Sequence, residues 1–186
     1  TTDDVLFLVE ALLKSGQAKS AIPILEAERL RVPGDVRLSV QSAHAWLADG
    51  YPRPAANLFM MAALKDEKYA RDAAEIYREK GMLQHALRSN ARILDQETKL
   101  RQRLAILIDM ERFEAVTALA PRLSRLELLT KDEELRYALA YALYRVGHYG
   151  GAEKHLSKLT KPALFARAGT LRKAMAECRR NGAQCD

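Results

Sequence analysis

The sequence predicts an all-α fold, in which short helical hairpins stack into an α-solenoid and a last helix closes the stack. The 186 residues include only 9 Gly and 6 Pro, and 48% are hydrophobic and 29% charged, which favours helix and excludes intrinsic disorder. Apolar residues recur at three- and four-residue spacings, as on one face of a helix. Turn residues recur at intervals of 34, 31, 30 and 36, at Gly16, Gly50, Gly81, Glu111 and Gly147.

Each predicted hairpin has the same parts in the same order. A first helix, with apolar spacing like that of Val5, Val9 and Leu12, leads into a turn whose glycine tolerates a positive φ. Five residues after the turn comes a small residue that lets the two helices approach closely. These small residues are Ala21, Ala55, Ala86, Val116 and Ala152. Pro33 and Pro162 mark where the first and last hairpins must end.

The segments that carry this pattern predict the domain organisation. They span residues 8–25, 42–59, 73–91, 104–120 and 138–156, and the fourth is degenerate because Glu111 stands at the glycine position. We therefore expect about five hairpins in residues 1–162, and a capping helix with a short tail in 163–186. The expected helix at 163–180 carries an apolar stripe, as a helix that covers the last repeat requires. The stripe consists of Leu164, Ala168, Leu171, Met175 and Cys178.

The repeated pattern resembles the tetratricopeptide repeat (TPR) family, whose consensus places Gly at the turn between large and small residues. The second segment matches at Ala43, Trp46, Gly50, Ala55, Phe59 and Ala62, and the fifth at Leu139, Ala140, Gly147, Tyr149, Ala152 and Leu156. The resemblance implies a right-handed solenoid whose first helices line a concave groove that binds a protein or peptide. The family's Lys/Asn/Arg clamp for a terminal carboxylate is not matched.

Helical spacing on the first helices selects the candidate groove residues. Tyr137, Tyr141 and Tyr144 lie at i, i+4 and i+7 and form one stripe, which either binds a partner or packs against the capping helix. With arginines along the same surface, the groove would suit a peptide with apolar and acidic side chains. The remaining candidate partner-binding residues are Gln41, His44, Arg71, Glu75, Arg78 and Arg101.

The sequence contains no motif for catalysis, a cofactor or a metal. It has no glycine-rich phosphate loop, HExxH motif or nucleophile elbow, and no two of its four histidines lie at i,i+3 or i,i+4. His85 and His155 are expected at the surfaces of second helices. Acidic residues at 132–134 suit a helix start, with Thr130 as the N-cap and Glu133 completing a capping box. We therefore expect a non-catalytic protein without a cofactor or metal site.

The prediction of a cellular compartment depends on the two cysteines. Cys178 and Cys185 lie close together near the end of the chain, and a short turn would let them form a disulfide. The alternative is a buried Cys178 and an unrelated thiol in the tail. A disulfide would place the protein in the periplasm or another extracytoplasmic compartment, as part of an exported bacterial envelope or secretion assembly. The chain starts at Thr1 without a leader-like segment, so we expect a processed protein or a piece of a longer one.

Charge distribution suggests a second class of partner. The net charge is +6, and residues 94–186 hold 17 basic and 12 acidic residues, against 13 and 12 in residues 1–93. A nucleic-acid-binding helical repeat that uses this basic half is therefore the alternative function. It is disfavoured because no aromatic residues interleave the basic positions for base stacking. No apolar run is long enough to span a membrane, and the sequence leaves the identity of the partner and the oligomeric state open.

Overall fold

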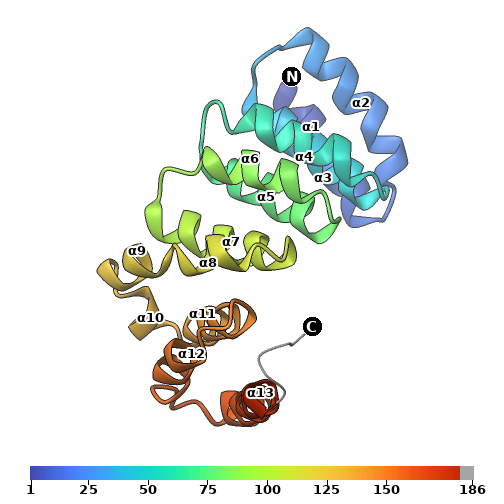
Figure 1. The fold of residues 1–186 in the computed structure, drawn as a ribbon. Coiled ribbons are helices and arrows are strands. Elements are labelled where there is room, and N and C mark those ends of the chain that lie inside the picture. The colour runs from blue at the N-terminus through green and yellow to red at the C-terminus, as the bar shows by residue number, and fades with distance from the viewer. Residues whose placement is uncertain (181–186) are drawn as a thin grey trace. The chain divides into compact units, whose positions relative to one another are not determined.

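The computed structural model describes residues 1–180, and all regular secondary structure in that range is α-helical (Figure 1). This confirms the predicted all-α class. The helices are α1 (Thr2–Lys14), α2 (Ala18–Arg31), α3 (Val36–Ala48), α4 (Pro52–Ala62), α5 (Lys68–Glu79), α6 (Leu83–Ala91), α7 (Gln96–Asp109), α8 (Phe113–Thr117), α9 (Ala120–Arg125), α10 (Leu128–Lys131), α11 (Glu133–Arg145), α12 (Tyr149–Leu156) and α13 (Pro162–Arg180).

The chain divides into two compact units, the first from Thr1 to Gln102 and the second starting at Arg103. In the first unit each helix from α1 to α6 packs against the next, and α1 also packs against α3. Consecutive helices therefore pair as antiparallel hairpins, and the first helices of the first two hairpins, α1 and α3, lie side by side. The core between them consists of small and branched side chains, including Val9, Ala21, Leu25, Leu38 and Ala45.

Glycines with a positive φ, in the left-handed backbone conformation, end the first helix of several hairpins. The φ angles are 76° at Gly16, 86° at Gly50, 70° at Gly81 and 77° at Gly147. At each of these four turns the residue after the glycine donates its backbone N–H to a carbonyl five residues earlier, which closes the helix end. Glu111 has the same role with a φ of 54°, although a side chain makes this conformation costly.

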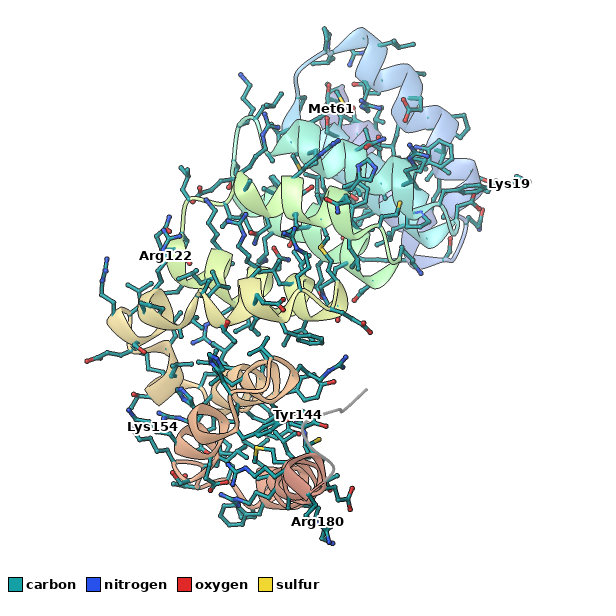
Figure 2. All side chains as sticks on the ribbon, in the orientation of Figure 1. Lys19, Met61, Arg122, Tyr144, Lys154 and Arg180 are labelled. Carbon is teal, nitrogen blue, oxygen red and sulfur yellow. The ribbon has the colours of Figure 1, made fainter. Side chains whose placement is uncertain are left out.

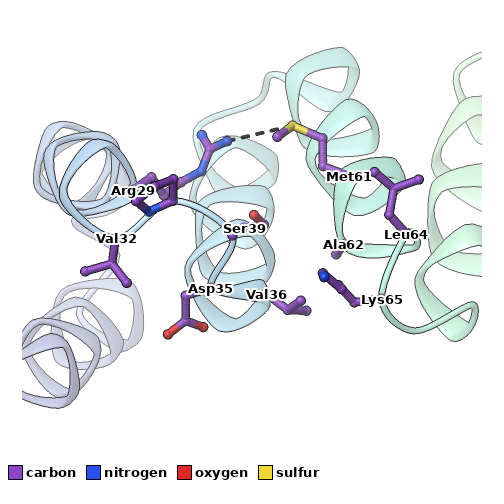
Figure 3. Close-up of a pocket in the computed structure, with 11 residues that line it drawn as sticks. Arg29, Val32, Asp35, Val36, Ser39, Met61, Ala62, Leu64 and Lys65 are labelled. Carbon is purple, nitrogen blue, oxygen red and sulfur yellow. Dashed lines mark hydrogen bonds between the residues drawn. The ribbon is translucent and has the colours of Figure 1, made fainter.

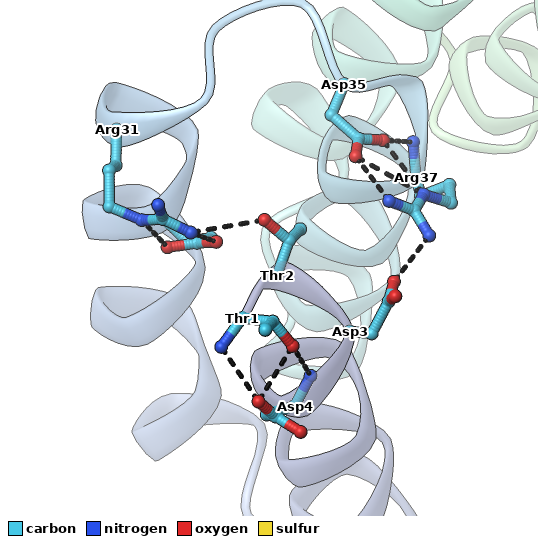
Figure 4. Close-up of polar contacts among 8 residues, drawn as sticks. Thr1, Thr2, Asp3, Asp4, Arg31, Asp35 and Arg37 are labelled. Carbon is cyan, nitrogen blue, oxygen red and sulfur yellow. Dashed lines mark hydrogen bonds and ion pairs between the residues drawn. The ribbon is translucent and has the colours of Figure 1, made fainter.

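Polar contacts hold the start of α1 against its neighbours (Figure 4). The Thr1 hydroxyl accepts from the Asp4 amide and the Asp4 carboxylate accepts from Thr1, a capping box. Arg37, at the start of α3, pairs with Asp3 at 2.8 Å. On α2, Arg31 bonds the buried Glu28 carboxylate. Hydrogen bonding to Arg31 lowers the pKa of Glu28 to about 2.

The fourth predicted hairpin departs from the pattern in its second half. Three short helices, α8, α9 and α10, stand where a single second helix would follow α7. Pro121 at the start of α9 has no backbone N–H to continue a helix from α8, and Glu127 has a φ of 56° between α9 and α10. The local sequence therefore breaks the second helix of this hairpin twice.

The start of α11 differs from the expected capping box. Asp132, not Thr130, is the N-cap, and its side chain accepts from the amides of Glu134 and Leu135. Thr130 lies in α10, and Glu133 instead accepts hydrogen bonds from Thr160 and the Lys161 amide. The expected box was wrong because Glu133 has better partners in the segment that leads into α13.

Candidate functional site

Three surface hollows lie along the first helices of the hairpins. The tyrosine hollow, about 410 Å³, lies between α11 and α13 in the second unit and is lined by Tyr137, Tyr141, Tyr144, Arg145, Arg167, Thr170, Leu171 and Ala174. The charged hollow, about 440 Å³, lies between α5 and α7 and is lined by Arg71, Asp72, Glu75, Thr98, Arg101 and Gln102. The amino-terminal hollow, about 410 Å³, is lined by Asp3, Leu6, Phe7, Glu10, Arg37, Val40, Gln41 and Tyr69.

The tyrosine hollow is built on a connected row of aromatic rings. Tyr141 meets the Phe113 ring edge-on at 5.8 Å and the Tyr144 ring at 6.3 Å, and Tyr144 meets Tyr149 at 6.1 Å. The three tyrosines of the stripe are half-buried and pack against the core of the second unit. The rings therefore pack on the core and also line a hollow, while binding of a partner by the stripe stays a prediction.

Two arginines edge this hollow, and their partners differ. Arg167 stacks over the Tyr137 ring at 4.2 Å and pairs with Glu134 at 2.8 Å. Arg145 stacks over the Phe113 ring at 4.4 Å and donates a 3.0 Å hydrogen bond to the Tyr141 hydroxyl. Among residues 1–180, no ion pair includes Arg145. The hollow thus presents a guanidinium oriented by the Tyr141 hydroxyl beside an aromatic surface, and the charge of Glu111 also acts on this guanidinium and raises its pKa.

The wall formed by α13 belongs to the hydrophobic core. Leu171 lines the hollow and is 5% exposed, and Leu164, Ala168 and Met175 continue the same buried face. The Tyr144 hydroxyl lies 3.8 Å from Cys178 Sγ. Figure 2 labels Tyr144 on α11. The predicted partner of this cysteine, Cys185, lies outside the described residues, so the disulfide stays a prediction.

The charged hollow is lined by groups that already satisfy one another. Arg78 donates two hydrogen bonds to the Glu75 carboxylate, which also accepts one from Gln102. Hydrogen bonding to Arg78 lowers the pKa of Glu75. Arg71 pairs with the adjacent Asp72 at 3.2 Å, and Gln102 also donates to the Arg71 carbonyl. A ligand in this hollow would have to replace internal contacts.

A fourth hollow, about 240 Å³, lies beside the ends of α2 and α4 and contains none of the candidate residues (Figure 3). Arg29 reaches across it to Met61 Sδ at 3.8 Å. Met61 and Leu64 are 52% and 67% exposed at its edge. Its lining is mixed, because the charged Arg29, Asp35 and Lys65 lie among apolar residues.

The structure brings the sequence-predicted residues into separate groups. The three tyrosines share one hollow, while Arg71, Glu75 and Arg101 line another and Arg78 reaches the latter through Glu75. Gln41 lines the amino-terminal hollow. His44 lines none of the four hollows; it is exposed and meets the Phe59 ring edge-on at 5.3 Å. No contact in the structure tests whether these residues bind a partner.

Arg145 and the residues contributed by α13 are not among the residues predicted from sequence. Arg145 follows Tyr141 by four residues, so helical spacing could have placed it on the stripe. Arg167 and Thr170 reach the hollow only because α13 packs beside α11, which no local pattern shows.

The histidines and the other polar candidates give no sign of chemistry. His85 and His155 were expected at the surface, but both are half-buried, and His85 stacks on the Tyr77 ring at 5.1 Å. Within residues 1–180, no group of three His, Cys, Asp or Glu side chains is placed to hold a metal ion. In the same range no helix combines the length and apolar character needed to cross a membrane.

Helices paired in this way define a TPR-like α-solenoid, and comparison with solved structures supports the same fold. MamA AMB-1 superposes with a TM-score of 0.58 at 16% identity, covering 90% of this chain and 96% of that one. MamA MSR-1 gives 0.57 at 17% identity, with 92% and 94% covered. The nearly identical TPR-like repeats assigned to a Podosopora anserina kinesin light chain give 0.56 at 14%, with 96% of each covered. No protein-family model and no curated protein matches the chain in sequence.

Proposed function

We propose that this protein is a non-catalytic scaffold that binds a partner protein through the first-helix face of its hairpins. The observation that carries the proposal is the tyrosine hollow, where half-buried rings line a recess beside the Arg145 guanidinium. Tyrosine offers a rigid apolar body with a polar tip, which makes it a preferred contact residue in protein interfaces. The TPR-like fold supports a protein partner as well.

The chemistry of the hollow specifies the partner segment. Leu171 and the three rings suit a large apolar side chain, and Arg145 suits a carboxylate next to it. Arginine binds carboxylates through parallel N–H donors, and such charge-assisted hydrogen bonds are stronger than neutral ones. The preferred partner is therefore a peptide segment in which an apolar residue lies beside Asp or Glu.

Selection from a random peptide library tests this function. Peptides selected on the intact chain should be enriched in apolar residues next to Asp or Glu, and should lose binding to Arg145→Gln. Arg71→Gln is the matched control, because it makes the same change in the charged hollow, where Arg71 already has a carboxylate partner. If the selected peptides bind Arg145→Gln as tightly as the unaltered chain, the tyrosine hollow is not their site.

An extracytoplasmic location and a role in an envelope or secretion assembly are part of the proposal. Both depend on a disulfide between Cys178 and Cys185. Thiol titration of protein purified without reductant, compared with reduced protein, measures this directly. Two reactive thiols in the unreduced protein would remove the argument for export.

The nucleic-acid alternative receives less support from the arrangement of α13. Arg167 pairs with Glu134, Arg172 pairs with Glu153, and Arg179 lies over the Tyr149 ring. These arginines are engaged within the second unit and do not form an open basic surface. Nucleic-acid binding would show an affinity that falls steeply with salt, whereas the proposed peptide site should show a weak dependence.

A further inference from the structure

The hollow beside the ends of α2 and α4 lies wholly within the first unit, apart from the tyrosine hollow (Figure 3). Most of its lining is apolar and consists of Val32, Pro33, Val36, Met61, Ala62 and Leu64. Met61 and Leu64 are more than half exposed, so a molecule in the hollow would cover apolar surface that otherwise meets water. The volume of about 240 Å³ is below the usual range for drug-sized ligands, which indicates a small occupant.

Two cations line this hollow, and the fold uses neither of them fully. Lys65 is exposed, and in the described part of the chain no ion pair includes it. Asp66, the next residue, pairs instead with Lys68 at 2.6 Å. Arg29 pairs through Nη1 with a carboxylate one turn earlier on α2, whereas its Nη2 reaches Met61 Sδ, a weak acceptor, at 3.8 Å. A stronger acceptor in the hollow would therefore gain donors from both residues.

The remaining polar groups of the lining determine which charge a ligand should carry. Asp35 accepts hydrogen bonds from the amide and the guanidinium of Arg37 and pairs with it at 2.8 Å, so its charge is already compensated. The Ser39 side chain makes no hydrogen bond within residues 1–180. Figure 3 shows the Ser39 hydroxyl and the Lys65 ammonium directed into the space between α3 and the end of α4. The hollow thus has donors and positive charge to offer, and its carboxylate is taken.

We propose that this hollow binds a small free monocarboxylate with a short branched apolar body, of which isocaproate is an example. The carboxylate accepts hydrogen bonds from the Lys65 ammonium, the Ser39 hydroxyl and Arg29 Nη2, and the apolar body lies against the apolar lining. A neutral or cationic molecule would leave Lys65 without a counter-charge. The end of a protein chain suits the hollow less well, because its last peptide N–H would need an acceptor and Asp35 is already used.

NMR titration of the intact chain, labelled at the methionine methyl groups, tests the site with isocaproate as the probe. The Met61 signal should shift and saturate, while that of Met175, in the core of the second unit, should stay in place. Isocaproamide has the same apolar body without the charge, and should bind about tenfold more weakly. No shift at Met61, or equal binding of the amide, would overturn the proposal.

A substitution of Lys65 tests the role of the charge. Because Lys65 is exposed and no ion pair within residues 1–180 includes it, Lys65→Gln should fold normally and bind isocaproate about tenfold more weakly. Lys80→Gln is the matched control, since it makes the same change at an exposed lysine of the first unit that does not line the hollow, and it should keep the affinity. Unchanged affinity in Lys65→Gln, or an equal loss in both variants, would contradict the proposal.

Two further ligands define the class of carboxylate. Acetate lacks the apolar body and should bind at least about tenfold more weakly than isocaproate, because it leaves the apolar lining uncovered. N-acetyl-leucine carries an amide beside its carboxylate, as the end of a protein chain does, and should also bind more weakly. Acetate binding as tightly as isocaproate would show that the apolar lining has no part in recognition. Equal or tighter binding of N-acetyl-leucine would identify a chain end as the ligand and overturn the assignment to a free acid.

Discussion

The tyrosine hollow and the charged hollow are similar in size and in their place on first helices, but they differ in how their lining groups are satisfied. In the charged hollow, Arg71, Arg78 and Glu75 bond to neighbours within the hollow itself. In the tyrosine hollow, Arg145 has aromatic rings and one hydroxyl as partners. A recess of a given size is thus a better candidate site where a partner adds contacts than where it must replace them.

The two hollows also differ in what lies beneath them. Leu171 and the tyrosines belong to the core of the second unit, so the stability of that unit and the shape of the hollow are linked. The charged hollow is lined by polar groups joined by hydrogen bonds, with Gln102 at their centre.

The core beneath the tyrosine hollow should be the most sensitive to substitution. Leu171→Ala should lower the free energy of unfolding by about 3 kcal/mol, because it removes buried methyl groups and leaves a cavity. Gln102→Ala in the charged hollow should cost about 1 kcal/mol, the usual value for lost hydrogen bonds. Urea unfolding measures both. Equal losses would show that the two hollows are supported in the same way.

The glycine turns of the first and second units should contribute equally to stability. Gly81 and Gly147 have nearly equal positive φ angles, and a Cβ added at either would meet no atom within 4 Å. Gly81→Ala and Gly147→Ala should therefore each cost about 1 kcal/mol, from backbone strain alone. Glu111→Gly should gain a similar amount at the turn that lacks glycine. Urea unfolding that showed unequal losses at the two glycines would mean that one turn bears further contacts.

Two hydroxyl deletions should separate binding from stability. Tyr77→Phe removes a 2.6 Å hydrogen bond to Asn57 in the first unit, and should cost about 1 kcal/mol of stability without affecting peptide affinity. Tyr141→Phe removes the hydroxyl that orients Arg145, and should weaken peptide binding about fivefold. Titration calorimetry and urea unfolding together check the pair. Loss of peptide affinity in Tyr77→Phe and not in Tyr141→Phe would reverse the assignment.

The smallest effect concerns the anchor of α13, the far wall of the tyrosine hollow. Hydrogen bonds from the Thr160 hydroxyl and the Thr160 and Lys161 amides lower the pKa of Glu133 to about 2, from an ordinary value of 4.5. The stabilisation is fully present above pH 4.5 and is lost as the pH falls towards 2. Thermal midpoints should therefore fall less steeply across this range in Glu133→Gln. Parallel curves would show that the anchor contributes nothing.

Local patterns predicted the all-α class and the tyrosine stripe, because both depend on residues close in sequence. Tyr137, Tyr141 and Tyr144 share a face through helical spacing alone. The partners of that stripe could not be predicted, since Arg167 and Leu171 reach it only when α13 packs beside α11. Glu133 shows the same limit. Its sequence position suited a capping box, but Thr160, distant in sequence, provided stronger partners.

NMR with ring-labelled tyrosine can locate peptide binding, because the seven tyrosines report on both units at once. A selected peptide with an apolar residue beside an acidic one is titrated into the intact protein. The signals of Tyr137, Tyr141 and Tyr144 should shift in proportion to binding, while those of Tyr69 and Tyr77 should stay unchanged. Shifts at Tyr69 or Tyr77 with none at the stripe would contradict it.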